Sequence, residues 1–262
     1  MPATELTPRT LDTITLIYAC PSPTKDRYQL ALFLPYLGGT KEAVSKQLSQ
    51  LAARGFTAIS FDPWRTGPRG NGDARTLIDQ VFSHFRRHMW PILGQSTLDA
   101  IHVLDWATEH FNVDAHNIVA GGLSMGGDIS IALAGIDQRV TRAAAVAATP
   151  DWTRPGMHSV TEPATVIDQG EPTAYGAWLY QQIDPASHPD HYTHGPAIAF
   201  ELGANDTHVP PASATAFHTT LRSAAPLAAE RMRITQHPGL DHFGTVQDEQ
   251  TVSAALDWMT LR

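Results

Sequence analysis

The sequence has a single cysteine, Cys20, among 262 residues, so no disulfide can form within the chain. It is also poor in positive charge, since 18 Lys and Arg stand against 26 Asp and Glu for a formal net charge of −8. Binding to phosphate backbones needs a surplus of Lys and Arg, so we expect no nucleic-acid partner. No apolar run approaches the roughly 18 residues of a membrane span, so we expect no membrane association. Residues 1–30 lack the pattern of a signal peptide. A cytoplasmic protein is therefore expected.

The rest of the composition is that of a globular protein, with 42% hydrophobic and 17% charged residues. We expect one domain over residues 1–262, because α/β folds of about 250 residues often form a single unit. Strand-like and helix-like segments alternate, which predicts a mostly parallel central sheet flanked by helices. The expected strands are 13–19, 28–35, 56–62, 117–123, 142–150, 197–203 and 231–239. The expected helices are 40–54, two within 73–110 of which the second opens at Ser96, 128–136, 210–224 and 245–261.

Residues 150–195 break this alternation, because the segment is rich in proline, histidine and aromatic residues. It is too short for an independent core. We expect a cap-like insertion over the active-site edge of the sheet.

One serine stands out in the stretch GGLSMGGD, which covers residues 121–128. Gly122, Ser124 and Gly126 form the pattern G-x-S-x-G between a predicted buried strand and a predicted helix. A turn this tight leaves no room for side chains beside the serine, and it lifts the hydroxyl clear of the sheet. The pattern predicts a nucleophile, with an ordinary tight turn as the alternative.

A serine hydroxyl needs a base, and the base needs an orienting carboxylate. Asp206, in GANDTHVP, follows one late strand, and His242, in GLDHFG, follows the next. The order Ser124, Asp206, His242 places all three at the carboxyl ends of strands, where parallel sheets hold their sites. We expect Asp241 to be only a loop residue, because it is too close in the chain to reach Nδ1 of its neighbour. A capping aspartate and a surface histidine are the alternatives for Asp206 and His242.

These three motifs resemble the α/β-hydrolase superfamily, most closely its dienelactone-hydrolase-like and prolyl-oligopeptidase-like serine esterase branch. The resemblance covers the chain from about Tyr28 onward. It implies an α/β-hydrolase fold, a Ser-His-Asp triad and no cofactor. Dienelactone hydrolases carry a cysteine nucleophile, so the serine makes that activity less expected here. The resemblance also implies two amides that bind the oxyanion, those of Met125 and Leu37, the latter in LPYLGGT where relatives often carry H-G-x-G-G.

Four further side chains are candidates for binding substrate: Tyr36, Trp64, Arg65 and Trp152. Packing roles are the alternatives for each. His188, His191 and His194 are spaced three apart, but Pro189 and Gly195 indicate a loop, so we expect no metal.

The expected activity is a serine carboxylesterase acting on small or medium esters. The same triad could instead serve a peptidase, a lactonase or a carbon–carbon hydrolase, and a non-catalytic binding protein on this fold is a further alternative. The expected partner is a small-molecule ester, and a homodimer through the insertion or a sheet edge is compatible with the sequence.

Overall fold

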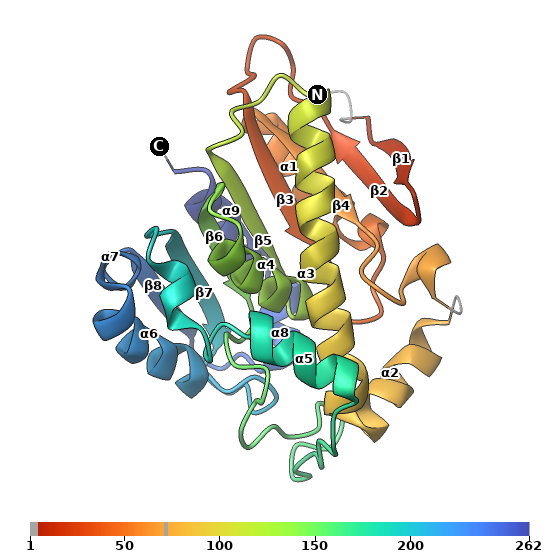
Figure 1. The fold of residues 1–262 in the computed structure, drawn as a ribbon, viewed down its shortest axis with the longest axis vertical. Coiled ribbons are helices and arrows are strands. Elements are labelled where there is room, and N and C mark those ends of the chain that lie inside the picture. The colour runs from red at the N-terminus through yellow and green to blue at the C-terminus, as the bar shows by residue number, and fades with distance from the viewer. Residues whose placement is uncertain (1–4, 71–72, 262) are drawn as a thin grey trace.

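The computed structural model describes residues 5–70 and 73–261, which form an eight-stranded sheet between two layers of helices (Figure 1). The order of strands across the sheet is β1-β2-β4-β3-β5-β6-β7-β8. The β1–β2 and β2–β4 pairs are antiparallel and all other pairs are parallel, which confirms the predicted sheet. The strands are β1 Thr7–Leu11, β2 Ile14–Ala19, β3 Gln29–Leu34, β4 Phe56–Phe61, β5 Ile118–Leu123, β6 Val140–Val146, β7 Ala197–Gly203 and β8 Met232–His237.

Helices bury an apolar cluster on each face of this sheet. On one face, α1 and α9 pack through residues such as Leu48 and Leu256. On the other, α3, α4 and α6 pack through residues such as Leu104, Ile129 and Phe217. The helices are α1 Ser45–Ala53, α2 Ala74–Ser83, α3 Phe85–His110, α4 Met125–Ile136, α5 Ala174–Ile183, α6 Ala212–Ala224, α7 Pro226–Glu230, α8 His242–Gln247 and α9 Glu249–Met259. Within the described ranges, none of them combines the length and apolarity needed to cross a bilayer.

The central strands are buried along their whole length. Every residue of β4, β5 and β7 is buried, as expected for parallel strands that are covered on both faces. Their carboxyl ends lie at one edge of the sheet. The loops that leave this edge carry the predicted nucleophile and the predicted acid.

The first strand, β1, was not expected from the sequence. Its segment, TPRTL, is largely exposed and contains Pro8, which opposes Ile17 in the register. Proline is tolerated in an edge strand because one side of such a strand needs no hydrogen-bond donor. The strand therefore gives little of the apolar alternation by which strands are recognised.

The helix expected to open at Ser96 begins eleven residues earlier in the chain, at Phe85, and that expectation was wrong. Pro91 lies inside α3 without ending it. Ser96 is buried in mid-helix, where its Oγ accepts a hydrogen bond of 2.8 Å from the amide of Trp64. The serine thus provides a hydrogen-bond acceptor for a backbone amide of the loop after β4 and does not cap a helix.

The helix expected over 245–261 is two helices, α8 and α9, separated at Asp248. The Asp248 carboxylate accepts hydrogen bonds from the amide and the hydroxyl of Thr251, both at 2.7 Å, which caps the start of α9. The first of the two begins at His242, which was expected in a loop.

Residues 150–195 run between the adjacent strands β6 and β7 and contain α5. This helix packs closely on α3, because a Cβ at Gly94 would lie only 2.6 Å from Cβ of Leu179. The Trp90 and Tyr180 rings stack beside this contact, with centroids 4.2 Å apart. The segment is therefore anchored to the helical layer, and two of its residues, Arg154 and Val160, reach the cavity described below.

Candidate active site

Ser124 occupies the turn between β5 and α4 in a strained conformation, with φ 49° and ψ −116°. Such backbone angles cost a non-glycine residue about 1–3 kcal/mol and persist where the surroundings enforce them. The flanking glycines are required by close packing. A Cβ on Gly122 would lie 2.4 Å from the backbone carbon of Gly126, and one on Gly126 would lie 2.3 Å from the carbonyl oxygen of Leu34.

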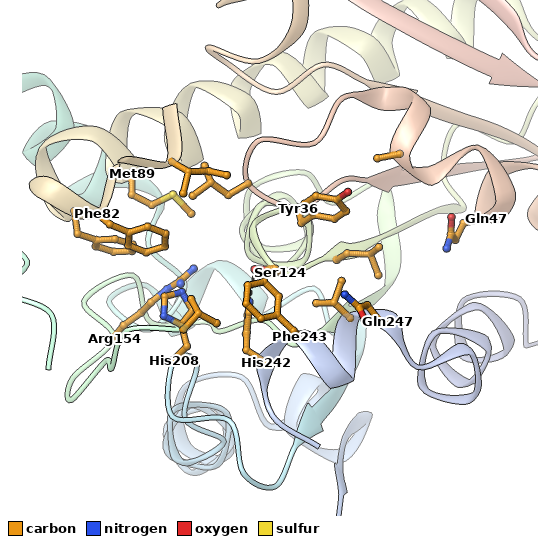
Figure 2. Close-up of a pocket in the computed structure, with 17 residues that line it drawn as sticks. Tyr36, Gln47, Phe82, Met89, Ser124, Arg154, His208, His242, Phe243 and Gln247 are labelled. Carbon is orange, nitrogen blue, oxygen red and sulfur yellow. Dashed lines mark hydrogen bonds between the residues drawn. The ribbon is translucent and has the colours of Figure 1, made fainter. Parts of the chain in front are cut away.

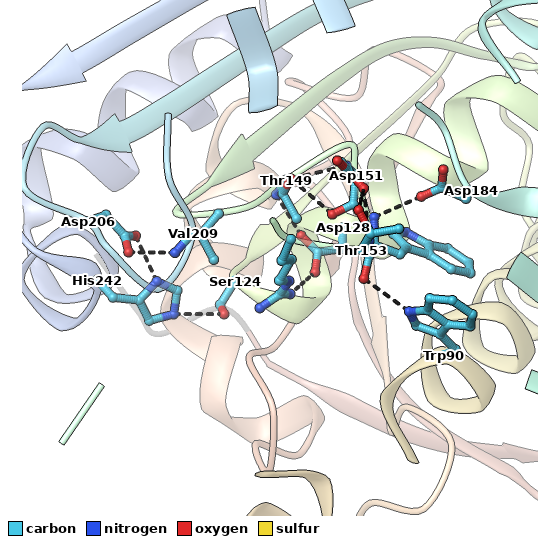
Figure 3. A network of polar contacts seen from close by, with 12 residues as sticks. Trp90, Ser124, Asp128, Thr149, Asp151, Thr153, Asp184, Asp206, Val209 and His242 are labelled. Carbon is cyan, nitrogen blue, oxygen red and sulfur yellow. Dashed lines mark hydrogen bonds and ion pairs between the residues drawn. The ribbon is translucent and has the colours of Figure 1, made fainter. Parts of the chain in front are cut away.

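The three predicted side chains form one hydrogen-bonded chain (Figure 3). Nδ1 of His242 lies 2.8 Å from Oδ2 of Asp206, and Nε2 of His242 lies 3.0 Å from Oγ of Ser124. A carboxylate only accepts hydrogen bonds, so Nδ1 carries the proton and Nε2 presents a lone pair to the serine hydroxyl. All three residues are buried. The arrangement can move a proton from the serine to the imidazole.

Asp206 is held by the backbone that follows it. Its Oδ1 accepts hydrogen bonds from the amides of His208, at 2.9 Å, and Val209, at 2.7 Å. This leaves Oδ2 for the imidazole. Asp241, next to His242 in the chain, instead accepts a 2.7 Å hydrogen bond from the amide of Gly244 at the start of α8, so it caps the helix that carries the histidine.

A cavity of about 400 Å³ opens onto Ser124 and His242 (Figure 2). Its inner part is lined by apolar side chains of α2 and α3, and its mouth by residues near α1 and α8. Tyr36 and Phe243 stand at the mouth with 41% and 51% of their surface exposed. On the side of α2 and α3, Phe85 and Met89 are buried and Ile78 and Phe82 are half-buried, and the side near α1 and α8 includes Gln47, Val246 and Gln247. A mainly apolar cavity with few polar groups is typical of a small-molecule site.

The two amides expected to bind an oxyanion lie on segments that meet at the serine turn. Met125 is the first residue of α4, so its amide is one of those a helix leaves without an internal partner. Leu37 lines the cavity. The end of β3, just before Leu37, touches Gly126, where a Cβ would lie 2.6 Å from the carbonyl oxygen of Pro35.

Of the four side chains expected to bind substrate, Tyr36 lines the cavity and the other three do not. Trp152 is fully buried, and its amide donates to Asp184 Oδ1 at 2.8 Å, so it belongs to the core and that expectation was wrong. Arg65 donates to Gln80 Oε1 at 2.5 Å, and its Nη1 lies 3.2 Å from Nδ1 of His88. It lines two smaller cavities that do not include Ser124. Trp64 packs under the guanidinium of Arg69.

His208 lies beside the site; from its place in the sequence it is an alternative to His242 that we expected at the entrance of the following helix instead. Its ring meets that of His242 edge to face at 4.8 Å between centroids, and its Nδ1 donates to the carbonyl oxygen of His158 at 2.8 Å. Burial, together with the nearby charge of Arg154, lowers the pKa of His208 to about 3. It is therefore a neutral imidazole. The one sequence feature that places His208 near the site is its position two residues after Asp206, directly before Val209 and Pro210.

Three residues of types that can bind a metal lie together at the short helix Pro189–Tyr192. One ligand atom each from His188, Asp190 and His191 lies within 4.8 Å of the others, but Nε2 of His188 already donates to the carbonyl oxygen of Gln181 at 2.6 Å. The third histidine of the predicted group, His194, instead donates from Nδ1 to the carbonyl oxygen of His191 at 3.1 Å. These residues are not among those that line the cavity at Ser124.

Comparison with known proteins gives a family for the chain. A sequence model of the prolyl oligopeptidase family matches residues 81–260, which run from the end of α2 through α9 and include all three residues of the hydrogen-bonded chain. No curated protein matches the sequence.

Solved structures share the fold at low sequence identity. TT1662 from Thermus thermophilus is 21% identical, with a TM-score of 0.72 and coverage of 99% of each chain. A candidate dienelactone hydrolase from Klebsiella pneumoniae subsp. pneumoniae is 18% identical, with a TM-score of 0.69 and coverage of 99% of this chain and 98% of that one. A thermophilic esterase from Thermogutta terrifontis, solved with butyrate bound, is 18% identical, with a TM-score of 0.62 and coverage of 98% and 91%. The fold is that of the α/β-hydrolases.

Proposed function

Because the chain belongs to the prolyl oligopeptidase family and has an α/β-hydrolase fold, we propose that it is a serine hydrolase of carboxylic esters. Ser124 is the nucleophile, His242 the general base and acid, and Asp206 the residue that orients and stabilises the imidazole. The observation that carries the proposal is the continuous hydrogen-bonded chain from Oγ of Ser124 to the Asp206 carboxylate, beside a cavity with a mainly apolar lining.

The reaction has two halves. Nε2 of His242 accepts the Ser124 proton while Oγ bonds to the ester carbonyl carbon and the carbonyl electrons move to its oxygen. The amides of Leu37 and Met125 donate hydrogen bonds to that oxyanion. When the carbonyl re-forms, the bond to the alcohol oxygen breaks, and the imidazolium gives its proton to the departing alcohol. Water then repeats the same steps on the acyl-enzyme and releases the acid.

The size and polarity of the cavity favour small or medium esters. At about 400 Å³, with aromatic and aliphatic side chains on its inner walls, it fits a short acyl chain better than an extended polar peptide. Butyrate, a four-carbon carboxylate, is bound in the similar Thermogutta terrifontis esterase. We therefore propose preference for short-chain esters.

A peptidase is the second candidate, since the matching family is named for oligopeptide cleavage. The same three residues would serve, with an amine as the leaving group. A lactonase or a carbon–carbon hydrolase would also use them. Only the substrate distinguishes these reactions.

A panel of p-nitrophenyl esters and the matching p-nitroanilides tests the proposal, with a fluorophosphonate probe to label the nucleophile. We expect ester turnover that is highest for short chains and falls at least about 1000-fold in Ser124→Ala, together with loss of labelling. Faster cleavage of anilides than of esters would favour the peptidase. Labelling or turnover retained in folded Ser124→Ala would refute the assignment of the nucleophile.

A further inference from the structure

Arg154 is a buried cation in the wall of the active-site cavity. Only 2% of its surface is exposed, yet it lines the cavity together with Ser124. Its backbone is in the left-handed region, with φ 41°, and Figure 2 shows its side chain beside His208, on the same side of the cavity as Phe82 and Met89. A strained backbone around a buried charge indicates that the fold holds this side chain in place.

One carboxylate balances the charge of Arg154 and fixes its orientation. Nη2 donates to Oδ2 of Asp128, which is fully buried, and Oδ1 of Asp128 accepts a 2.7 Å hydrogen bond from the amide of Thr149. The guanidinium also lies over the ring of Phe85, 5.2 Å from its centroid. Side chain and partner therefore form a rigid, neutral pair.

This pairing leaves hydrogen-bond donors of Arg154 unused. A guanidinium has five N–H groups, and Asp128 takes one of them in this structure. Over residues 5–70 and 73–261, Nε of Arg154 is fully buried without a hydrogen-bond partner, whereas Nη1 also lacks a partner but is not fully buried. Nη1 is therefore the unused donor that a ligand oxygen in the cavity can reach, and an unpaired donor costs free energy that such a contact recovers.

The surroundings of Arg154 are otherwise apolar. Phe82, Phe85 and Met89 form the adjacent wall, and His208 is uncharged because burial and Arg154 itself depress its pKa. Arg154 is the one Lys, Arg, Asp or Glu side chain among the described residues that line the cavity. The inner part of the cavity thus combines apolar walls with one positively polarised end.

We infer that Arg154 determines specificity, and that the inner part of the cavity takes an acyl chain carrying a neutral oxygen acceptor, such as a ketone or amide carbonyl. The inference rests on the proposed ester hydrolysis. The inner part suits the acyl group, which stays on Ser124, whereas the exposed mouth between Tyr36 and Phe243 suits the departing alcohol. A neutral acceptor fits better than a carboxylate, because Asp128 already balances the charge and a second anion would be buried without a partner.

Two substrates of equal size test the inference: p-nitrophenyl 4-oxopentanoate, which has the acceptor, and p-nitrophenyl 4-methylpentanoate, which replaces it with a branched alkyl group. The measured quantity is the ratio of their kcat/KM values. We expect the wild-type protein to favour the keto ester, and this ratio to fall about 10- to 100-fold in Arg154→Met/Asp128→Asn, the range of one hydrogen bond to a charged donor. The double variant avoids leaving Asp128 as an unpaired buried anion.

Two further variants sharpen the comparison. Arg154→Lys keeps the charge beside Asp128 but loses the planar fork, so its ratio should lie between those of the wild type and the double variant. Arg65→Met makes the same Arg to Met change outside the cavity and should leave the ratio as it is in the wild type. Circular dichroism and thermal melting establish that each variant is folded.

The outcomes separate this inference from the proposed function. Ester turnover with an unchanged ratio in the folded double variant overturns the role of Arg154 and leaves the hydrolase intact. A stronger preference for a carboxylate-bearing ester than for the keto ester contradicts the choice of a neutral acceptor. Calorimetric binding of both esters in a Ser124→Ala background measures the same preference without turnover, so it tests the role of Arg154 even if no ester is cleaved. Equal affinity for the two esters there would also overturn the inference.

Discussion

Oγ of Ser124 and Nε2 of His242 lie 3.0 Å apart although 118 positions separate the two residues in the chain. The contact is made because β5 and β8 run in the same direction in one sheet and the loops after them open at the same edge. The pair is within the reach needed for proton transfer from a hydroxyl to an imidazole.

Removing the charge of Asp206 is expected to lower kcat by about 10⁴-fold, because an asparagine amide can donate to Nδ1 and so stabilise the wrong tautomer of His242. The measurement is kcat on p-nitrophenyl butyrate for Asp206→Asn. Asp241→Asn is the matched control, since it makes the same change one residue from His242, at a capping position where asparagine serves as well as aspartate. Similar losses in the two variants would contradict the assignment of Asp206.

Leu37→Pro is expected to reduce kcat by about 100- to 1000-fold, because proline has no amide hydrogen to give to the oxyanion. Leu37→Ala keeps the amide and changes only the side chain in the cavity, so its loss should be much smaller. Comparing the two by kcat separates the amide from the side chain. Equal kcat values in both variants, with both folded, would place the second oxyanion donor elsewhere.

Gly126→Ala is expected to reduce both stability and activity. The new Cβ would meet the carbonyl oxygens of Leu34 and Pro35, which are backbone atoms that cannot rotate away. A clash of this kind typically costs about 1–3 kcal/mol, and relieving it moves the end of β3 away from the serine turn. Urea unfolding and kcat provide the two measurements.

Gly156→Ala is the control for that substitution. Its φ is +73°, but no atom outside the adjoining residues lies within 4 Å of the added Cβ, so only the backbone cost of about 1–2 kcal/mol remains. Activity that survives in Gly126→Ala as well as in Gly156→Ala would show that this close approach does not govern the site.

His208 makes the stability of the protein depend on pH. Its pKa of about 3 lies below the ordinary value of 6.5. Between pH 6.5 and 3, His208 is therefore protonated in the unfolded chain and neutral in the folded chain. The free energy of unfolding therefore falls as the pH drops from 6.5 towards 3, and above 6.5 this residue has no effect.

His208→Gln should remove this dependence. In the wild type, His208 lowers the free energy of unfolding by at most about 1.4 kcal/mol for each unit that the pH falls from 6.5 to 3, and the variant should lack this contribution. Glutamine keeps a donor for the carbonyl oxygen of His158. The measurement is urea unfolding of both proteins at several pH values. Parallel curves for wild type and variant would mean that His208 is not held neutral.

The sequence predicted the three hydrogen-bonded residues of the candidate site better than the cavity around them. Ser124 and Asp206 follow strands that are buried on both faces, and short motifs mark the loops after them. The sequence also predicted Tyr36 near the serine, and it does line the cavity, because it follows β3 at the same edge of the sheet. Phe82 and Met89 were not predicted, because they come from helices whose placement over the sheet depends on packing across the whole layer.

The errors had local causes. Ser96 has the chemistry of a cap, but α3 continues through Pro91 because tertiary packing outweighs the lost hydrogen bond. Trp152 follows a strand at the correct edge, yet its ring turns into the core, and periodicity does not report the direction of a side chain after a strand ends. The neighbouring Arg154 faces the cavity instead.

The anchoring of residues 150–195 between β6 and β7 ties the wall of the cavity to the hydrogen-bonded chain. Ser124, Asp206 and His242 all lie outside this segment, whereas Arg154 and Val160 of the cavity wall lie within it. The carbonyl oxygen of His158, also in the segment, accepts the hydrogen bond of His208, two residues from Asp206. A change in the length of this segment would therefore reshape the cavity and shift the loop of Asp206 together.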